Sequence, residues 1–285
     1  MNRTSIYKSA EGERKIKELN DMVSGYWPVP CDKLNISTRH GNTFIIASGE
    51  VKSPPLILLH GAGASAVSWM GDIVEYSRRF RVYAVDIPGE AGKSDPVRLP
   101  WNGPGYGEWL EDVLNGLNIA KASLVGLSLG GWMSLKLATY RPERVEKLVL
   151  LATGGIIPAR ASFLLRCIWF SLFGEWGANK INRLVFGKQP VSEEAMRFFK
   201  VILDNFKPRM DKQPMFTDQE LAGLSMPVLL IAGLQDVIFP SQKIADRMRR
   251  LVPQVEVKIL PDQGHALLGL TGMTVPFLMK KIKLA

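Results

Sequence analysis

Short apolar runs alternate with stretches of helical periodicity along most of the chain. Six of these runs have the length and residue types expected of strands buried on both faces of a sheet. They span residues 56–59, 81–87, 122–125, 145–152, 228–232 and 255–260. Helical stretches lie at 65–79, 106–118, 129–140, 241–251 and 266–283. This alternation predicts an α/β fold, with a mostly parallel central sheet covered by helices on both faces.

The N-terminal part of the chain has a different pattern. Residues 4–24 are predicted to form a charged helix, which the glycine and prolines that follow would end. Short strands are expected at 34–37 and 43–48. The pair Gly41-Asn42 is expected to form the turn of a hairpin between them.

A second departure lies between Thr153 and Leu224, where no strand pattern appears and aromatic residues are frequent. The segment is too long for a loop without secondary structure, so we expect it to form helices that pack over the sheet. The predicted organisation is a helical extension at 1–30, an α/β core at 31–153 and 223–285, and a helical lid at 154–222.

Composition and charge exclude several classes of protein. The 285 residues are 46% hydrophobic and 22% charged, which excludes intrinsic disorder over most of the chain. The net charge of +9 comes from scattered basic residues without a nucleic-acid-binding motif, so no nucleic-acid partner is expected. The most apolar stretch, 161–173, carries Arg166 and is too short to span a bilayer, so no membrane span is expected.

The expected location is cytoplasmic. The first twenty residues are charged throughout and lack the apolar core of a signal peptide. Cys31 and Cys167 are far apart in the sequence, and free thiols in a reducing compartment are the simplest interpretation. Neither the two cysteines nor the three histidines have the spacing of a metal site, so no metal or other cofactor is expected. The oligomeric state stays open.

A G-x-S-x-G motif at residues 126–130 is the strongest signal for chemistry. It directly follows an apolar run and opens a helical stretch, which is the position of a nucleophile on a strand-to-helix turn. Such a turn is tight, so the residues two positions to either side of the serine must be small. Ser128 is therefore the candidate nucleophile. The alternative is a serine that only caps a helix.

Three motifs together resemble the α/β-hydrolase superfamily, and in particular its bacterial carboxylesterase-like branch with a helical lid. They are the serine motif, the turn His60-Gly61-Ala62-Gly63, and a segment at 86–94 that is similar to D-x-P-G-x-G-x-S with one extra residue. The resemblance implies that the backbone N–H groups of Ala62 and Leu129 form an oxyanion hole. It also implies that His60 shapes its turn and is not the catalytic base.

The candidate base is His265, one of three histidines. It follows the last apolar run, which places it at the C-terminal edge of the predicted sheet, where α/β proteins build their sites. Asp236 follows the preceding run and is expected to orient the imidazole. Asp262 is nearer to His265 in the sequence and is the weaker alternative. The order Ser128, Asp236, His265 is that of the α/β-hydrolase fold.

These residues predict a serine hydrolase that cleaves carboxylic esters of small to medium apolar substrates through an acyl-enzyme. Its partner would be a small-molecule ester substrate. Trp169 and Phe173, in the predicted lid, are expected to bind the substrate. A ligand receptor or signalling protein of the same fold, a C–C bond hydrolase, an amidase and a cofactor-free peroxidase would carry the same residues and are the alternatives.

Overall fold

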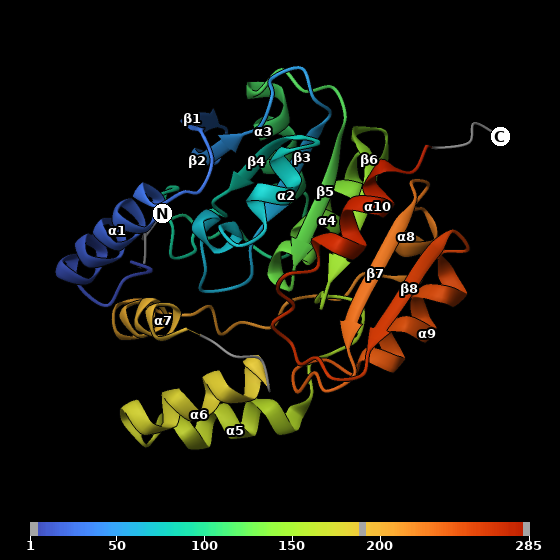
Figure 1. Ribbon diagram of the computed structural model, residues 1–285. Coiled ribbons are helices and arrows are strands. Elements are labelled where there is room, and N and C mark those ends of the chain that lie inside the picture. Colours follow the sequence, from blue (N-terminus) through green and yellow to red (C-terminus); the bar gives the residue numbers. More distant parts are fainter. Residues whose placement is uncertain (1–4, 188–191, 282–285) are drawn as a thin grey trace.

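An eight-stranded sheet runs through the molecule (Figure 1). The computed structural model describes residues 5–187 and 192–281, and within them the strands are ordered β1-β2-β4-β3-β5-β6-β7-β8. Their bounds are β1 Cys31–Thr38, β2 Gly41–Ser48, β3 Pro55–Leu59, β4 Arg81–Val85, β5 Ala122–Leu127, β6 Val145–Leu151, β7 Val228–Gly233 and β8 Val255–Leu260. Strand β2 is antiparallel to both of its neighbours, and the other pairs are parallel. The predicted mostly parallel sheet is confirmed.

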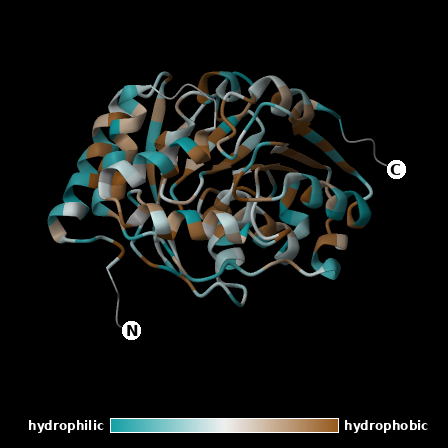
Figure 2. Cartoon of the chain, turned by 90° about the horizontal axis from the view of Figure 1, so that it is seen from below, coloured by the Kyte–Doolittle hydropathy of each residue, from teal (hydrophilic) through white to brown (hydrophobic). Residues whose placement is uncertain are grey.

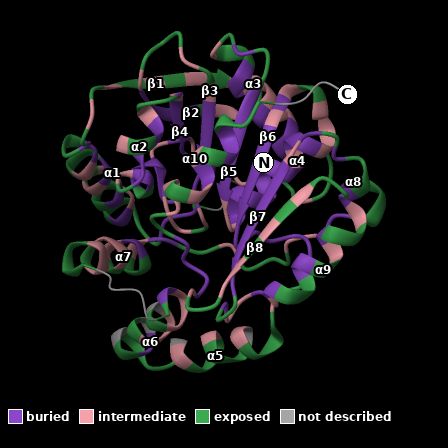
Figure 3. Ribbon diagram, turned by 45° about the vertical axis from the view of Figure 1, so that its right-hand side comes forward, coloured by how far each residue is buried: buried purple, intermediate pink, exposed green. Residues whose placement is uncertain are grey.

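The central strands are buried on both faces. Leu56 to Leu59 of β3 are 0% exposed, and β7 is buried along its whole length. A strand without a solvent face carries a continuous apolar run, which explains why these strands are visible in the sequence. The edge strand β8 instead alternates between half-buried and exposed positions. Figure 3 shows the buried strands at the centre, and Figure 2 shows that they are largely hydrophobic.

Helices cover both faces of the sheet. On one face lie α3 (Gly105–Gly116), α4 (Leu129–Tyr140) and α9 (Ser241–Leu251), which contribute Trp109, Trp132 and Ile244 to one core cluster. On the other lie the 3-10 helix η1 (Ala66–Trp69), α2 (Ile73–Ser77) and α10 (Thr271–Met279). A further 3-10 helix, η2 (Pro142–Arg144), precedes β6. The prediction of two helical layers is confirmed.

Three local predictions are wrong. The hairpin turn is formed by Arg39 and His40, because Thr38 already pairs with Gly41, and Gly41 takes its positive φ of 117° as the first residue of β2. The helix predicted at 65–79 is divided into η1 and α2 around Gly71. The helix predicted at 266–283 begins only at Thr271, because the preceding residues form the loop after β8.

Helices also occupy the segment in which no strand was expected. They are α5 (Ala161–Ser171), α6 (Gly174–Phe186), α7 (Glu193–Asn205) and α8 (Asp218–Ala222). The α5–α6 pair lies beyond the C-terminal ends of β7 and β8, whereas α7 lies beside the N-terminal helix α1 (Ala10–Gly25) in both Figure 1 and Figure 3. The division into extension, core and lid stays a prediction.

The N-terminal helix is shorter than predicted, because the residues before it pair with another segment. Ser9 caps α1 by accepting the Gly12 N–H, so the helix begins at Ala10. The preceding segment lies antiparallel to the end of α7, where Lys8 N–H donates to the Asn205 carbonyl at 2.8 Å. In the described part of the chain, no helix is long and apolar enough to cross a membrane.

Candidate active site

Ser128 lies on a strained turn between β5 and α4, with a positive φ of 53°. The turn is possible because its neighbours lack side chains. A Cβ atom at Gly126 would lie 2.3 Å from the Gly130 carbonyl oxygen, and one at Gly130 would lie 2.0 Å from the Leu59 carbonyl oxygen. Strain of this kind persists only where the surrounding structure fixes it, and such residues concentrate at functional sites.

Backbone hydrogen bonds fix the turn in place. The Ser128 N–H donates to the Leu151 carbonyl of β6 at 2.8 Å, and the Ser128 carbonyl accepts from the Gly154 and Trp132 N–H groups. The Ser128 side chain makes no cap hydrogen bond to α4. Its hydroxyl is therefore directed elsewhere, which argues against the helix-cap interpretation.

The Ser128 hydroxyl contacts His265, which lies in the loop after β8. The distance from Ser128 Oγ to His265 Nε2 is 2.9 Å, and the distance from His265 Nδ1 to Asp236 Oδ2 is also 2.9 Å. His265 is 6% exposed and Asp236 is 3% exposed, so water does not screen the contact between them. Because the carboxylate accepts, Nδ1 carries the ring proton and Nε2 can accept from the serine hydroxyl.

Asp236 is oriented by the loop after β7. Its Oδ1 atom accepts the N–H groups of Ile238 at 2.7 Å and Phe239 at 3.0 Å, which leaves Oδ2 for His265. The Phe239 ring also packs against the imidazole, with the ring centres 5.5 Å apart. Asp262, the alternative in the sequence, is exposed, and the carboxylate against the ring is that of Asp236.

The turn after β3 lies close to Ser128 and carries Ala62, one of the two candidate oxyanion donors, whereas the other donor, Leu129, directly follows Ser128 in the chain. A Cβ atom at Gly61 would lie 3.8 Å from Ser128 Cβ, so this turn packs against Ser128. The N–H groups of Ala62 and Leu129 have no hydrogen-bond partner among the described residues. Unpartnered backbone N–H groups are the donors that an oxyanion hole requires, and the oxyanion role of these two groups stays a prediction.

His60 is a structural histidine. It is 0% exposed, and both ring nitrogens are used, since Nδ1 donates to the Gly61 carbonyl and Nε2 accepts the Ile87 N–H. Burial lowers the pKa of His60 to about 4, so the ring is neutral at physiological pH. It joins the turn after β3 to the loop after β4.

Two buried acids were not singled out by sequence reasoning. Asp86 accepts the Ala66 and Lys93 N–H groups, and burial raises its pKa to about 6. Glu90 is 6% exposed and accepts the Gly63 N–H at 2.6 Å, and burial raises its pKa to about 7. The signal that could have drawn attention to Glu90 is the extra residue in the segment at 86–94.

The structure does not bring the two predicted lid residues to the nucleophile. Trp169 is 60% exposed and Phe173 is 45% exposed. Their ring contacts are with each other, at 5.4 Å, and between Phe173 and Trp176, at 5.7 Å. These contacts lie within the α5–α6 hairpin, so a role of Trp169 and Phe173 in substrate binding stays a proposal.

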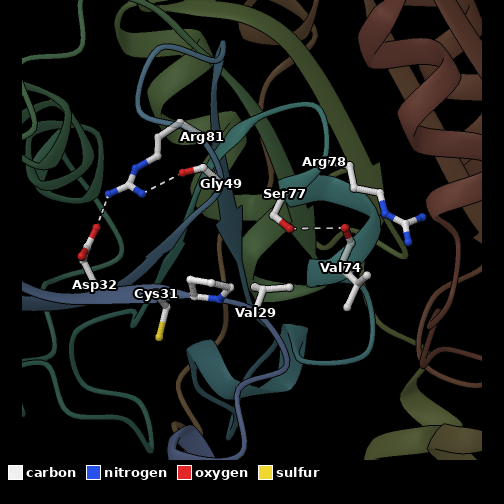
Figure 4. A pocket seen from close by; sticks show the side chains of 9 residues that line it. Val29, Cys31, Asp32, Gly49, Val74, Ser77, Arg78 and Arg81 are labelled. Atoms are coloured by element: carbon white, nitrogen blue, oxygen red, sulfur yellow. Dashed lines mark hydrogen bonds and ion pairs between the residues drawn. The ribbon is translucent and has the colours of Figure 1, made fainter.

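A cavity of about 450 Å³ lies elsewhere, beside the N-terminal end of β4 (Figure 4). Its cationic side chains are already engaged: Arg81 binds Asp32 and the Gly49 carbonyl, and Arg78 binds Glu75. Ligands of open α/β sheets bind at the C-terminal ends of the strands, which is the opposite edge. In the described residues, no group of three or more His, Cys, Asp or Glu side chains could hold a metal ion.

Known proteins share both the sequence and the fold. The model of the alpha/beta hydrolase family matches residues 56–271. The uncharacterised carboxylesterase nap of Bacillus subtilis (strain 168) is 35% identical over 269 residues, covering 91% of this chain and 88% of the relative. The crystal structure of carboxylesterase CesB (YbfK) from Bacillus subtilis aligns with a TM-score of 0.86 and 31% identity, covering 96% of this chain and 100% of that one.

The naproxen esterase of Bacillus subtilis, carboxylesterase NP, has a solved structure that aligns with a TM-score of 0.83 at 29% identity. The alignment covers 95% of this chain and 96% of that one. The matches extend over the strand-to-helix turn at Ser128 and over the loops that carry Asp236 and His265. This chain belongs to the alpha/beta hydrolase family.

Proposed function

We propose that this protein is a serine hydrolase of carboxylic esters in which Ser128, His265 and Asp236 form the catalytic triad. The supporting observation is the continuous chain of contacts from Ser128 Oγ through the imidazole to the Asp236 carboxylate, at 2.9 Å for each step. The carboxylesterases among the relatives support an ester as the substrate class.

In this proposal Ser128 Oγ attacks the ester carbonyl while His265 Nε2 takes its proton. Asp236 holds the Nδ1 proton and stabilises the imidazolium, and the N–H groups of Ala62 and Leu129 donate to the oxyanion. His265 then gives the proton it took from Ser128 to the alcohol oxygen, and the alcohol leaves. The acyl group stays bound to Ser128 Oγ as an acyl-serine. Water then gives a proton to His265 and attacks the acyl carbon, and His265 returns that proton to Ser128 Oγ as the bond to the acyl group breaks and the acid is released.

The finer proposal concerns the substrate and the lid. Residues 154–222 would form the lid, and the preferred esters would be small to medium and apolar. Support comes from the aromatic side chains of the α5–α6 hairpin, which lies beyond the same sheet edge as His265 and Asp236. Apolar lining with few polar groups is the usual composition of a small-molecule site.

A cytoplasmic location is also a proposal. Cys31 and Cys167 are both free thiols in the structure, which is the state expected of cysteines in a reducing compartment. Fractionation of the source cells followed by immunodetection would test it, and recovery outside the cytoplasmic fraction would contradict it.

The triad is tested by substituting its members one at a time. Ser128→Ala and His265→Ala are expected to lower kcat for p-nitrophenyl butyrate by at least about 10⁴-fold, because each removes part of the nucleophilic unit. His40→Ala is the matched control, since His40 lies in the β1–β2 turn, where its Nε2 atom is 3.4 Å from a Glu108 carboxylate oxygen. Activity of Ser128→Ala near the wild-type value would refute the assignment.

A fluorophosphonate probe separates the enzyme from the receptor alternative. The proposal predicts that the probe labels Ser128 in the wild-type protein and fails to label Ser128→Ala. A labelled Ser128 in a protein that turns over no ester of a broad acyl panel would instead favour a receptor or another reaction, and parallel assays with amides and C–C bond substrates would identify which.

A further inference from the structure

The buried carboxylate of Glu90 contacts the turn that carries Ala62. Glu90 lies in the loop after β4, in the segment that is one residue longer than D-x-P-G-x-G-x-S. Its carboxylate accepts the Gly63 N–H at 2.6 Å, and the residue is 6% exposed. A charged acceptor at this distance makes one of the stronger hydrogen bonds available to a backbone N–H.

The hydrogen bond at the Gly63 N–H holds the turn immediately after Ala62. Gly63 has a positive φ of 66°, and it directly follows the residue whose own N–H is the candidate oxyanion donor. The Gly61 carbonyl, at the start of the turn, accepts from His60 Nδ1 at 2.8 Å and from the Ala64 N–H at 3.3 Å. The bond to Glu90 therefore fixes the peptide plane between Ala62 and Gly63, on the C-terminal side of Ala62, while the bonds to the Gly61 carbonyl hold the peptide unit that carries the Ala62 N–H.

The loop that carries Glu90 is itself held on both sides. Gly89 N–H donates to the Asp95 carbonyl, and Glu90 N–H donates to the Ile87 carbonyl. The following carbonyl, that of Ala91, accepts from the Asn20 side chain at 3.0 Å. The Glu90 carboxylate thus projects from a fixed backbone, which is what a group that positions another needs.

We propose that Glu90 is a positioning residue that anchors Gly63 and so aligns the Ala62 N–H with the oxyanion. The inference rests on the proposed function. Glu90 touches neither the substrate nor the triad in this role, because its effect passes through the backbone of the turn. Losing an oxyanion donor altogether costs about 10²–10³-fold in rate, so a misaligned donor is expected to cost somewhat less.

The charge of Glu90 gives this role a distinctive stability signature. Burial raises the pKa of Glu90 to about 7, against the opposing effects of the Gly63 N–H and of Arg98 and Arg209. A carboxyl group with a higher pKa in the folded protein than in the unfolded chain lowers the stability of the protein as the pH rises from the unfolded pKa to the folded pKa. Glu90→Gln keeps an oxygen acceptor for Gly63 and removes the charge, so it should melt higher than the wild type at pH 8.

The test compares Glu90→Gln with Glu90→Leu in the full chain, with active sites counted by fluorophosphonate labelling. Glu90→Leu removes the acceptor, and its kcat for p-nitrophenyl butyrate should fall about 10–100-fold while KM changes less than about threefold. Glu90→Gln should keep kcat within about threefold of the wild type. Affinity for butylboronic acid, which mimics the tetrahedral state, should fall with kcat in Glu90→Leu only.

Several results would overturn the role of Glu90. These are an unchanged kcat in Glu90→Leu, an equal loss in both variants, or a change confined to KM. If Glu90→Leu does not fold, Glu90→Met takes its place, because its flexible side chain fills a similar volume without accepting a hydrogen bond. A wild-type protein that is not labelled at Ser128 overturns the proposed function and this inference together, whereas a labelled wild type with indifferent variants overturns only this inference.

Discussion

At the scale of single residues, the turn at Ser128 depends on glycines whose nearest neighbours are backbone atoms. The carbonyl oxygen nearest to Gly130 is that of Leu59, at the end of a strand that pairs on both sides. Such an oxygen cannot move aside as the end of a flexible side chain could. The close packing of α4 on β3 is therefore a requirement for the geometry of the nucleophile.

Gly130→Ala is expected to damage both stability and catalysis. The added Cβ would meet the Leu59 oxygen at 2.0 Å, so α4 must shift, which should cost about 1–3 kcal/mol of unfolding free energy. A shift of about 1 Å at Ser128 should lower kcat about 100-fold. Thermal denaturation and kcat per labelled active site measure the two effects. Gly71→Ala is the control, because its Cβ would meet no atom within 4 Å, and equal behaviour of the two variants would contradict the prediction.

His60 makes stability depend on pH with a definite sign. Its pKa is lowered to about 4 by burial, below the usual value of 6.5, so protonation favours the unfolded chain. At neutral pH the neutral His60 ring costs no stability. As the pH falls from 6.5 toward 4, the unfolded chain binds a proton at His60 that the folded protein does not, so the free energy of unfolding decreases. Asp86 and Glu90 act in the opposite direction, because burial raises their pKa values to about 6 and about 7.

The His60 contribution can be isolated by comparing pH dependences. Between pH 7 and pH 4.5, the wild type should lose about 2 kcal/mol of unfolding free energy that His60→Asn does not lose. Urea denaturation of both proteins at the two pH values measures this difference. Parallel pH dependences in the two proteins would mean that folding does not lower the pKa of His60, contrary to its buried position.

At the scale of elements, the α5–α6 hairpin differs from the helices that cover the sheet. Its two helices pack on each other, and large apolar side chains point into solvent. They are Leu165, Ile168, Trp169, Leu172, Phe173 and Trp176, each between 45% and 73% exposed. A contiguous apolar surface is expected at an interaction site, so an apolar ester in contact with this hairpin fits the proposed lid.

If the lid binds the acyl chain, activity should rise with chain length. Each methylene that leaves water adds about 0.8 kcal/mol, or roughly fourfold in kcat/KM, until the pocket is filled. The expected rise runs from p-nitrophenyl acetate through butyrate to hexanoate, and Trp169→Ala or Phe173→Ala should flatten it. Met22→Ala on α1, which removes another exposed apolar side chain, is the control. A profile that is indifferent to chain length in all four proteins would exclude the lid from substrate binding.

At the scale of the whole molecule, the parts that the sequence predicts are those set by burial. The strands from β3 to β7 are predicted to within a few residues, because strands with two buried faces must be apolar throughout, whereas β8 has the predicted bounds but is half-exposed. The hairpin turn is missed, since Gly41 supplies a positive φ at the start of a strand and the turn itself carries Arg39 and His40. The helix break around Gly71 is also missed, although a glycine inside a helical pattern is a local sign of such a break.

The sequence likewise predicts the candidate site in part. Ser128, Asp236 and His265 each follow a strand, so parallel pairing brings them to one edge, and only the fold decides between Asp236 and Asp262. The contacts of Glu90 and Phe239 could not be foreseen, because they depend on the path of a loop, although the extra residue at 86–94 marks the segment that contains Glu90. The exposed positions of Trp169 and Phe173 likewise depend on how the α5–α6 hairpin is placed.

The positions of β7 and β8 have a consequence for a chain that is still being synthesised. They are the last strands of the described residues and form one edge of the sheet, and the loops after them carry Asp236 and His265. The ribosome releases the N-terminal part first, so the turn around Ser128 can fold before the proposed acid and base have emerged. Incomplete chains from interrupted translation would carry Ser128 without the proposed base, His265, and would therefore not hydrolyse esters in the cell.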